Sequence, residues 1–114
     1  MAKVIITAKL KEEILKKFKG ESETVFRLLY SLEQSPHKGK LLDSIGGIQI
    51  KEIRYNSFRF YFLVEGYKIK ILDDGEFLNL LIKFLKMSNK KDQQKVIEEI
   101  KDFLRTFGKD ALKE

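Results

Sequence analysis

Two consecutive stretches near the start of the chain place apolar residues every three or four positions, after a short β-like segment at residues 3–7. This spacing is typical of amphipathic helices. Gly20 separates the stretches, Ser22 suits the N-cap of the second helix, and Ser35-Pro36 ends it. We therefore predict an antiparallel helical hairpin. Its apolar positions are Leu10, Ile14, Leu15 and Phe18 in the first helix and Val25, Phe26, Leu29 and Leu32 in the second.

From Ile48 onward the hydrophobic period changes to two, and turn signals follow at short intervals. Asn56-Ser57, Glu65-Gly66 and Asp74-Gly75 each suit a two-residue hairpin turn. The pattern predicts an antiparallel meander. The first two turns place residue 55 opposite 58 and residue 64 opposite 67. One face of this meander is continuously apolar and is predicted to be the core face. It contains Ile53, Tyr55, Phe58, Phe60, Phe62, Val64, Tyr67, Ile69 and Ile71.

The opposite face of the meander carries polar side chains. The same register puts Arg54 across from Arg59, and Tyr61 across from both Glu52 and Lys70. Like charges directly opposite each other on an antiparallel pair are destabilising, so the two arginines require a counter-anion. In one interpretation Glu52 is the counter-anion, and the three residues form a solvated Glu-Arg-Arg cluster. In the other, the counter-anion is a bound phosphate, and the arginines form a phosphate site. The residues leave both interpretations open.

The C-terminal third contains one ambiguous segment and one clear helix. Residues 77–87 alternate as in a strand but also fit one helix face, and we favour a strand. Residues 96–107 carry a strong amphipathic stripe, with Asn89 as N-cap and Gly108 past the last turn. We expect this helix to dock on the chain's own sheet, with a second copy in a homodimer or a partner as the alternative. The tail 109–114 is predicted to be frayed.

Composition narrows the class of protein. The 114 residues form one domain, and 23 Lys and Arg against 17 Asp and Glu give a charge of +6, which favours an acidic or polyanionic partner. With no cysteine and no signal peptide, we expect a cytoplasmic protein. No apolar run reaches the roughly 20 residues of a membrane-spanning helix, so no membrane partner is expected.

Common catalytic motifs do not fit the chain. Gly39-Lys40 resembles the end of a phosphate-binding loop, but Gln34 replaces the required glycine. His37 is the single histidine and cannot make a metal site alone, so neither a metal nor another cofactor is predicted. As a loop histidine it is either ordinary surface or an acid or base near neutral pH. The segment 83–91 holds four lysines and no acid, and precedes a helix N-terminus, which suits either a solvated connector or an anion site.

Taken together, three segments resemble the RelE/ParE superfamily of toxin-antitoxin toxins, and most closely its HigB-like branch. They read PHKGKLLDSIGGIQIKEIR, FRFYFLVEGYKIKIL and KFLKMSNKKDQQKVIEEI. The resemblance covers residues 36–104 and rests on the order and spacing of these parts. It implies a compact RelE-like α+β fold, in which an N-terminal helical hairpin packs on a small antiparallel meander and a C-terminal amphipathic helix follows.

The resemblance also implies an activity, namely metal-independent cleavage of mRNA on the ribosome. The 2′-hydroxyl attacks the adjacent phosphate, and cations stabilise the phosphorane. Arg59 would then be the phosphate-stabilising arginine, Arg54 its companion, and Tyr61 would stack a base or hold the leaving oxygen. Glu52 and His37 are the candidates for the general base. The RNA-binding candidates are Lys38, Lys40, Lys70, Lys83, Lys86, Lys90 and Lys91.

The implied partners are a cognate antitoxin, mRNA and the ribosome. Two other functions remain open, because a fold is compatible with several activities. The first is a non-enzymatic toxin or regulator that binds a protein target, as the gyrase-poisoning branch does. The second is a catalytically inactive, basic nucleic-acid-binding module.

Overall fold

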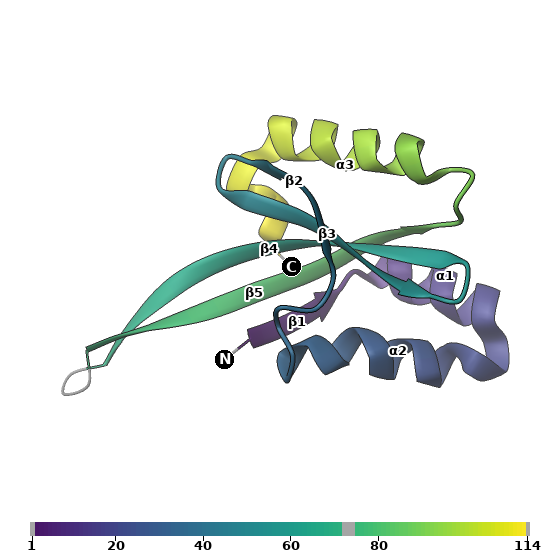
Figure 1. The fold of residues 1–114 in the computed structure, drawn as a ribbon, viewed down its shortest axis with the longest axis horizontal. Coiled ribbons are helices and arrows are strands. Elements are labelled where there is room, and N and C mark those ends of the chain that lie inside the picture. The colour runs from purple at the N-terminus through teal and green to yellow at the C-terminus, as the bar shows by residue number, and fades with distance from the viewer. Residues whose placement is uncertain (1, 72–74, 114) are drawn as a thin grey trace.

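A computed structural model describes residues 2–71 and 75–113, with the side chains of residues 66–79 outside the description. The chain is α+β, as predicted, and its elements surround one five-stranded sheet of order β1-β5-β4-β3-β2 (Figure 1). The strands are β1 Ala2–Ile6, β2 Lys40–Ile45, β3 Ile48–Tyr55, β4 Phe58–Ile71 and β5 Gly75–Ser88, and the α-helices are α1 Ala8–Phe18, α2 Ser22–Tyr30 and α3 Gln93–Phe107. Short 3-10 helices are η1 Lys19–Glu21, η2 Ser31–Glu33 and η3 Gly108–Leu112.

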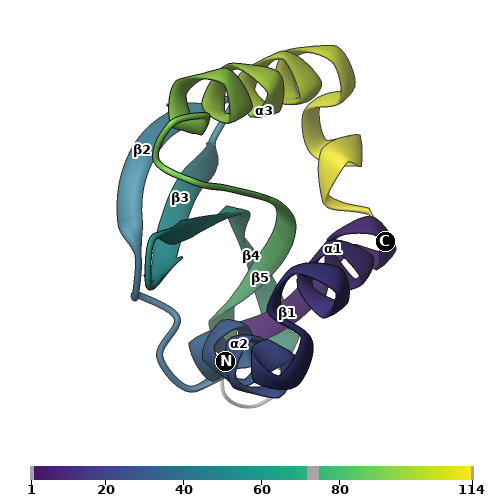
Figure 2. The same ribbon diagram turned by 90° about the vertical axis from the view of Figure 1, so that its right-hand side faces the viewer.

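Helices α1 and α2 form where the helical spacing predicts them, and they cover one face of the sheet (Figure 2). The Thr7 side chain caps α1 by accepting a hydrogen bond from Leu10 N at 3.3 Å. The predicted N-cap of α2 is wrong, because η1 leads directly into the helix and Ser22 is its first residue. The core beneath these helices contains Val4, Ile6, Leu10, Ile14, Phe18, Val25, Leu29, Leu32, Phe60, Phe62, Val64, Ile82 and Phe84.

The hairpin between β3 and β4 has the predicted register. Tyr55 lies opposite Phe58, and Arg54 lies opposite Arg59. Asn56 adopts a φ of 54° at the turn, a conformation that asparagine tolerates better than most residues. The local turn chemistry therefore determined this pairing correctly.

The predicted turn at Glu65-Gly66 is wrong, because β4 continues without interruption to Ile71. Its partner beyond residue 64 is β5, where Val64 lies opposite Ile82. A long strand with alternating apolar residues tolerates one internal glycine when a neighbouring strand of equal length supplies the backbone pairing. The predicted turn at residues 74–75 includes residue 74, which lies outside the described residues. The side chains of Tyr67, Ile69 and Ile71, which were predicted to belong to the core face, also lie outside the description.

Residues 77–87 are a strand, as favoured, and this strand makes the sheet mixed. β5 pairs antiparallel with β4 on one side and parallel with β1 on the other. The predicted meander was wholly antiparallel, because a parallel pairing between segments more than 70 residues apart leaves no local turn signal.

The second face of the sheet is covered by α3 and is therefore not the solvated face that one interpretation required (Figure 2). The α3 stripe docks on the chain's own sheet, as expected. The buried residues of this second core are Ile48, Ile50, Tyr61, Leu63, Ile97, Ile100, Leu104, Ala111 and Leu112. No helix in the described residues is long and apolar enough to cross a membrane.

The boundaries of α3 differ from the prediction at one end. Asp92 is the N-cap, and its backbone N–H donates to Asn89 Oδ1 at 2.9 Å. Asn89 therefore closes the turn before the helix and is not its N-cap. Gly108 ends the helix as predicted, with a φ of 54°.

The C-terminal segment is ordered against the body, and the predicted fraying of residues 109–114 is wrong for its described part. Ala111 and Leu112 in η3 are only 1% and 4% exposed. The buried Lys83 Nζ donates to Ala111 O at 2.7 Å and to Lys113 O at 2.6 Å. A single lysine thus holds two carbonyls of the last turn.

Replacing Lys83 by methionine is expected to lower the free energy of unfolding by about 1–3 kcal/mol, because the buried Ala111 carbonyl and the partly buried Lys113 carbonyl lose a charged donor. Backbone amides of η3 should then exchange faster with solvent, as measured by hydrogen exchange. Lys109→Met is the matched control, since the Lys109 side chain is 79% exposed. Equal stability of the two variants would contradict this role of Lys83.

Candidate functional site

Chemically active side chains line up across four strands on the face that α3 covers. The register places Lys40 of β2 beside Glu52 of β3, Glu52 beside Tyr61 of β4, and Tyr61 beside Lys86 of β5. Directly opposed residues of an antiparallel pair point to the same face. The strands therefore bring a lysine, a carboxylate, a phenol and another lysine into one row.

A second row lies next to the first, at the β3–β4 hairpin. Arg54 of β3 lies opposite Arg59 of β4, which in turn lies opposite Ser88 of β5. The two middle residues of the first row and all three residues of the second form what we call the arginine cluster. Its members are Glu52, Arg54, Arg59, Tyr61 and Ser88.

Glu52 is the counter-anion that the facing arginines require. One carboxylate oxygen lies 3.6 Å from Arg54 Nη2, and the other lies 3.8 Å from Arg59 Nε. The Glu52 and Arg59 side chains are 1% and 7% exposed, whereas the Arg54 side chain is 56% exposed. The cluster is thus a buried pair with one arginine at the surface.

The buried pair is held by charge and not by hydrogen bonds. Both separations exceed hydrogen-bond length, and within the described residues Glu52 Oε1, Glu52 Oε2 and Arg59 Nε have no hydrogen-bond partner. Arg59 makes one long hydrogen bond, from Nη1 to the carbonyl of Ser57 at 3.4 Å. Buried charged groups are normally better satisfied than this. The arginines therefore keep donor capacity that an anion would use.

Tyr61 is the most deeply buried member of the cluster. Its hydroxyl and that of Ser88 share a hydrogen bond of 2.8 Å, in which either oxygen is able to donate. Burial raises the pKa of the Tyr61 phenol above its usual value, and the nearby Glu52 carboxylate adds to this, while Ser88 and the two arginines act in the opposite direction. The phenol is therefore neutral and protonated at physiological pH.

We expect Tyr61 to titrate above the usual phenol range, because its pKa is raised in the folded protein. The stability of the fold should therefore fall at alkaline pH. The folded state binds the proton more tightly than the unfolded state, so the free energy of unfolding decreases as pH rises through about 10. In a spectrophotometric titration the Tyr61→Phe variant should lose a late-ionising phenol, and its unfolding should depend less on pH above about 10. Tyr30→Phe, at a half-exposed site, is the control, and an identical loss in both variants would contradict the assignment.

The predicted base-stacking role of Tyr61 does not fit its position. The ring is 0% exposed and packs in the second core, so it offers no face to a nucleotide base in this structure. Sequence periodicity placed Tyr61 on the correct face but treated that face as open. Docking of α3 explains the difference.

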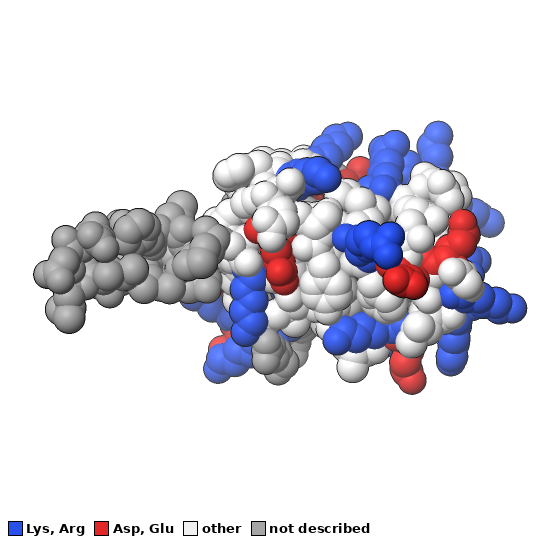
Figure 3. Space-filling view, turned by 90° about the horizontal axis from the view of Figure 1, so that it is seen from below, with Lys and Arg blue, Asp and Glu red and all other residues white. Residues whose placement is uncertain are grey.

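Lysines flank the cluster in the strand register, since Lys40 lies opposite Glu52 and Lys86 lies opposite Tyr61, and Lys90 and Lys91 follow the end of β5. Lys86 is 35% exposed and its Nζ lies 3.1 Å from Glu99 Oε2 on α3. Lys40, Lys90 and Lys91 are exposed. By contrast, the view from the α1 and α2 side shows Lys and Arg interspersed with Asp and Glu (Figure 3). The candidate anion surface is therefore formed by Arg54 together with these lysines.

The predicted loop residues lie apart from the cluster. His37 and Lys38 are exposed, and the His37 carbonyl accepts a hydrogen bond from Lys51 Nζ at 3.3 Å. Lys51 precedes Glu52 in the strand, so its side chain belongs to the opposite face. Within the described residues, the His37 side chain makes no hydrogen bond or ion pair with the cluster.

Two further RNA-binding candidates have different outcomes. Lys83 is buried and bound by backbone carbonyls of the C-terminal segment, and burial lowers its pKa. Its ammonium is thus occupied inside the protein. The side chain of Lys70 lies outside the described residues, and its backbone pairs with Glu76 and not with Tyr61, as the incorrect turn had placed it.

Ser88 is the functional candidate that sequence reasoning missed. It follows from the pairing of Arg59 with Ser88, which the incorrect turn at residues 65–66 concealed. The signal available in the sequence was alternation along 86–88, where Lys86 and Ser88 share a face, although a register shift at this point of β5 puts Phe84 on the other face.

Among the residues that the structure describes, no three His, Asp or Glu side chains gather into a group able to hold a metal ion. The cluster's own donors are cationic or hydroxylic, and they suit an oxyanion. No family model, curated protein or solved structure matches this chain, so its resemblance to the RelE/ParE superfamily stays a prediction.

Proposed function

We propose that the chain is a toxin of RelE-like fold that cleaves mRNA without a metal, and that the arginine cluster binds the reacting phosphate. The observation that carries the proposal is the loose attachment of two facing arginines to one carboxylate, at 3.6 and 3.8 Å. A phosphate between the guanidinium groups would supply the short, charge-assisted hydrogen bonds that Glu52 does not make. Such a site favours developing negative charge.

The proposed reaction is an internal phosphoryl transfer. The 2′-oxygen loses its proton and bonds to the adjacent phosphorus, the bond from phosphorus to the 5′-oxygen breaks, and the leaving oxygen takes a proton from water. The products are a 2′,3′-cyclic phosphate and a 5′-hydroxyl. Arg54 and Arg59 stabilise the phosphorane, and Glu52 accepts the proton once the phosphate has drawn the arginines away from it.

Lysines at the rim complete the proposed site by contacting RNA backbone. In the strand register Lys40 lies opposite Glu52, Arg54 lies opposite Arg59 and Lys86 lies opposite Tyr61, whereas Lys90 and Lys91 follow the end of β5. Such contacts contribute affinity that falls with salt and is independent of sequence. The ribosome, a cognate antitoxin that masks this surface and a cytoplasmic site of action belong to the same proposal.

The test is induction of the chain in a bacterial host, with growth and the 5′ ends of messenger RNA followed together. We expect growth arrest with new 5′-hydroxyl ends. Purified protein, with ribosomes present, should generate cyclic phosphate ends in EDTA. Arrest with intact messages would reject the nuclease and direct attention to a protein target, as in the gyrase-poisoning branch.

Burial of the cluster favours one alternative function. Arg59, Glu52 and Tyr61 are all nearly inaccessible, so a chain that keeps this arrangement when bound would contact RNA only through Arg54 and the lysines. That chain would be a nucleic-acid-binding module without catalysis. It predicts salt-sensitive RNA binding, no new RNA ends and no growth arrest.

A further inference from the structure

The pairing of β5 with β4 contains a bulge beside the arginine cluster. The pairing passes from Phe84 directly to Lys86, so Leu85 is the extra residue. Phe84 packs in the core under α1 and α2, whereas Leu85 packs against the second core, on the α3 face. Lys86 belongs to the same face, because its Nζ binds Glu99 of α3 at 3.1 Å. The bulge therefore directs two consecutive side chains of β5 toward α3.

A hollow of about 460 Å³ opens at this bulge, and most of its lining surface is apolar. Small-molecule sites in proteins have volumes of about 300–1,000 Å³ and mostly apolar walls with a few polar groups. The hollow has this size and this character, so it is large enough for a planar aromatic ring system. Its walls come from Leu85 and Lys86 of β5, Phe103 and Glu99 of α3, and residues at the start of α1.

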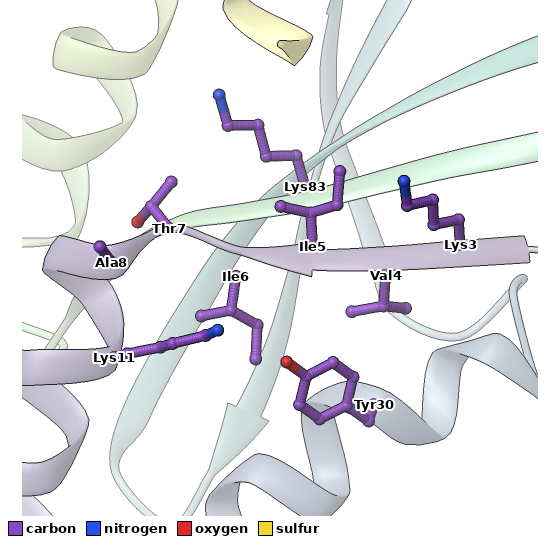
Figure 4. A pocket seen from close by; sticks show the side chains of 9 residues that line it. All are labelled: Lys3, Val4, Ile5, Ile6, Thr7, Ala8, Lys11, Tyr30 and Lys83. Carbon is purple, nitrogen blue, oxygen red and sulfur yellow. The ribbon is translucent and has the colours of Figure 1, made fainter. Parts of the chain in front are cut away.

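Lys83 gives the hollow no free charge. It lines this hollow and also a second one along β1 (Figure 4). Its ammonium is bound by the carbonyls of Ala111 and Lys113 at 2.7 and 2.6 Å. Lys86 is paired with Glu99, so two of the lysines in the lining are engaged inside the protein. Stacking and hydrogen bonding, more than charge, therefore select the occupant.

Phe103 is the aromatic ring that the hollow offers. Its side chain is half-buried, and its ring packs against that of Phe107 with 5.1 Å between the ring centroids. Bases of single-stranded RNA stack on accessible aromatic side chains, because every base has a π face. Tyr61 offers no such surface, since it is fully buried. Phe103 is thus the ring near the cluster on which a base is able to stack.

The hollow adjoins the arginine cluster. Lys86 lines the hollow and lies directly opposite Tyr61, a member of the cluster. Neighbouring strands are about 5 Å apart. This spacing is comparable with the distance between a phosphate and a base in one nucleotide. RNA whose phosphate is held by Arg54 and Arg59 would therefore bring the base of a neighbouring nucleotide to the hollow.

Glu99 supplies a group that distinguishes one base from another. Lys86 Nζ binds one of its carboxylate oxygens, Oε2, which leaves Oε1 as a hydrogen-bond acceptor. A carboxylate accepts a hydrogen bond from the amino group of cytosine. Adenine and guanine also carry amino groups, whereas uracil has none. The hollow should therefore favour an amino-bearing base over uracil.

From these observations we infer that the hollow at the β5 bulge is a base-binding subsite. Phe103 stacks on the base of a nucleotide next to the bound phosphate, and Glu99 accepts a hydrogen bond from the amino group of that base. The inference rests on the proposed function, because its ligand is RNA. It assigns a base preference to a surface outside the arginine cluster.

The test uses a short 2′-O-methyl RNA, which is not cleaved because its attacking oxygen is blocked. One base at a time is removed to leave an abasic sugar, and the affinity of each RNA is measured at one salt concentration. In the unchanged chain, removal of one particular base should weaken binding about tenfold, and in Phe103→Leu less than about twofold. Phe107→Leu is the matched control and should keep the tenfold difference, since Phe107 lies one turn along α3 and outside the hollow.

The base preference is measured at the same position of the RNA. The unchanged chain should bind cytosine there about fivefold more tightly than uracil, and Glu99→Ala should reduce this ratio to less than about twofold. Ratios are compared because Glu99→Ala also frees Lys86, which strengthens the binding of every RNA. Glu98→Ala is the control, because Glu98 is exposed, pairs with Lys101 and does not line the hollow.

The outcomes separate the subsite from the proposed function. If the folded chain binds RNA but base removal has the same effect in Phe103→Leu, or the base ratio is unchanged in Glu99→Ala, then the inference is wrong and RNA binding stands. If the folded chain binds no RNA, the proposed function fails and the subsite fails with it. Base-dependent binding through Phe103 in a chain that does not cleave unmodified RNA would support the subsite and reject the nuclease.

Discussion

Replacing Arg59 by alanine is expected to lower the rate of RNA cleavage about 10²–10³-fold, because the variant loses a preorganised donor to the phosphorane. Arg59 is the better placed of the two arginines, since its guanidinium is buried and its side chain is fixed between Glu52 and the Ser57 carbonyl. A buried cation acts on a phosphate through less solvent than an exposed one. Arg54→Ala should therefore have the smaller effect.

The same change threatens the fold, because Glu52 would lose its buried partner. Removing one member of a buried ion pair typically costs about 3–5 kcal/mol. The double variant Arg59→Met/Glu52→Gln removes both charges at similar volume and should retain more stability. Arg59→Lys keeps the charge but loses the planar fork that binds two phosphate oxygens.

Activity and folding are then separable by measuring single-turnover cleavage and thermal unfolding on each variant. Arg27→Ala is the matched control, since Arg27 is an exposed arginine paired with Glu23 on α2 at 3.1 Å. If Arg59→Ala is folded and cleaves as fast as the unchanged chain, then Arg59 is a structural partner of Glu52 and the proposed site is wrong. Loss of cleavage in Arg27→Ala would indicate a general charge effect.

The parts of the site that the sequence predicts are those set by one local turn. Asn56-Ser57 determines the register of β3 and β4, and that register alone brings Arg54 opposite Arg59. The resulting need for a counter-anion leaves two candidates from the sequence, Glu52 and a bound phosphate, and the structure places Glu52 beside both arginines. Two-residue turns carry this information because they fix pairing on both sides at once.

The other parts depend on contacts between distant segments. Gly66 has the chemistry of a turn, yet the pairing of β4 with β5 along its whole length prevails over it. That error concealed Ser88 and placed Lys70 opposite Tyr61. Burial of the cluster follows from docking of α3. The amphipathic stripe of this helix predicts that it packs on an apolar surface, but it does not predict which part of the sheet the helix covers. The C-terminal segment is held by hydrogen bonds from Lys83. In the sequence, Lys83 is only one lysine of the basic segment 83–91, and nothing there indicates this contact.

Gly39→Ala is expected to lower the free energy of unfolding by about 3–5 kcal/mol, combining backbone strain with overpacking. Gly39 has a φ of 102°, which side chains with a Cβ rarely adopt. A Cβ there would lie 2.8 Å from Phe62 Cζ and 2.9 Å from the Glu52 carbonyl oxygen. Neither neighbour yields easily, because one is backbone of a central strand and the other is a buried ring packed on Phe84 at 4.6 Å.

The control for strain alone is Gly47→Ala, because Gly47 has a φ of 83° with nothing within 4 Å of an added Cβ. It should cost about 1–2 kcal/mol. In chemical denaturation the difference between the two variants then measures the close approach to β3 and β4. Phe62→Leu should relieve part of it, so the double variant with Gly39→Ala is expected to cost at least about 1 kcal/mol less than the sum of the singles. If the losses in the free energy of unfolding from Gly39→Ala and Phe62→Leu are additive, then the loop before β2 is not in tight contact with the Phe62 ring. The backbone of Glu52 would then be positioned by the sheet alone.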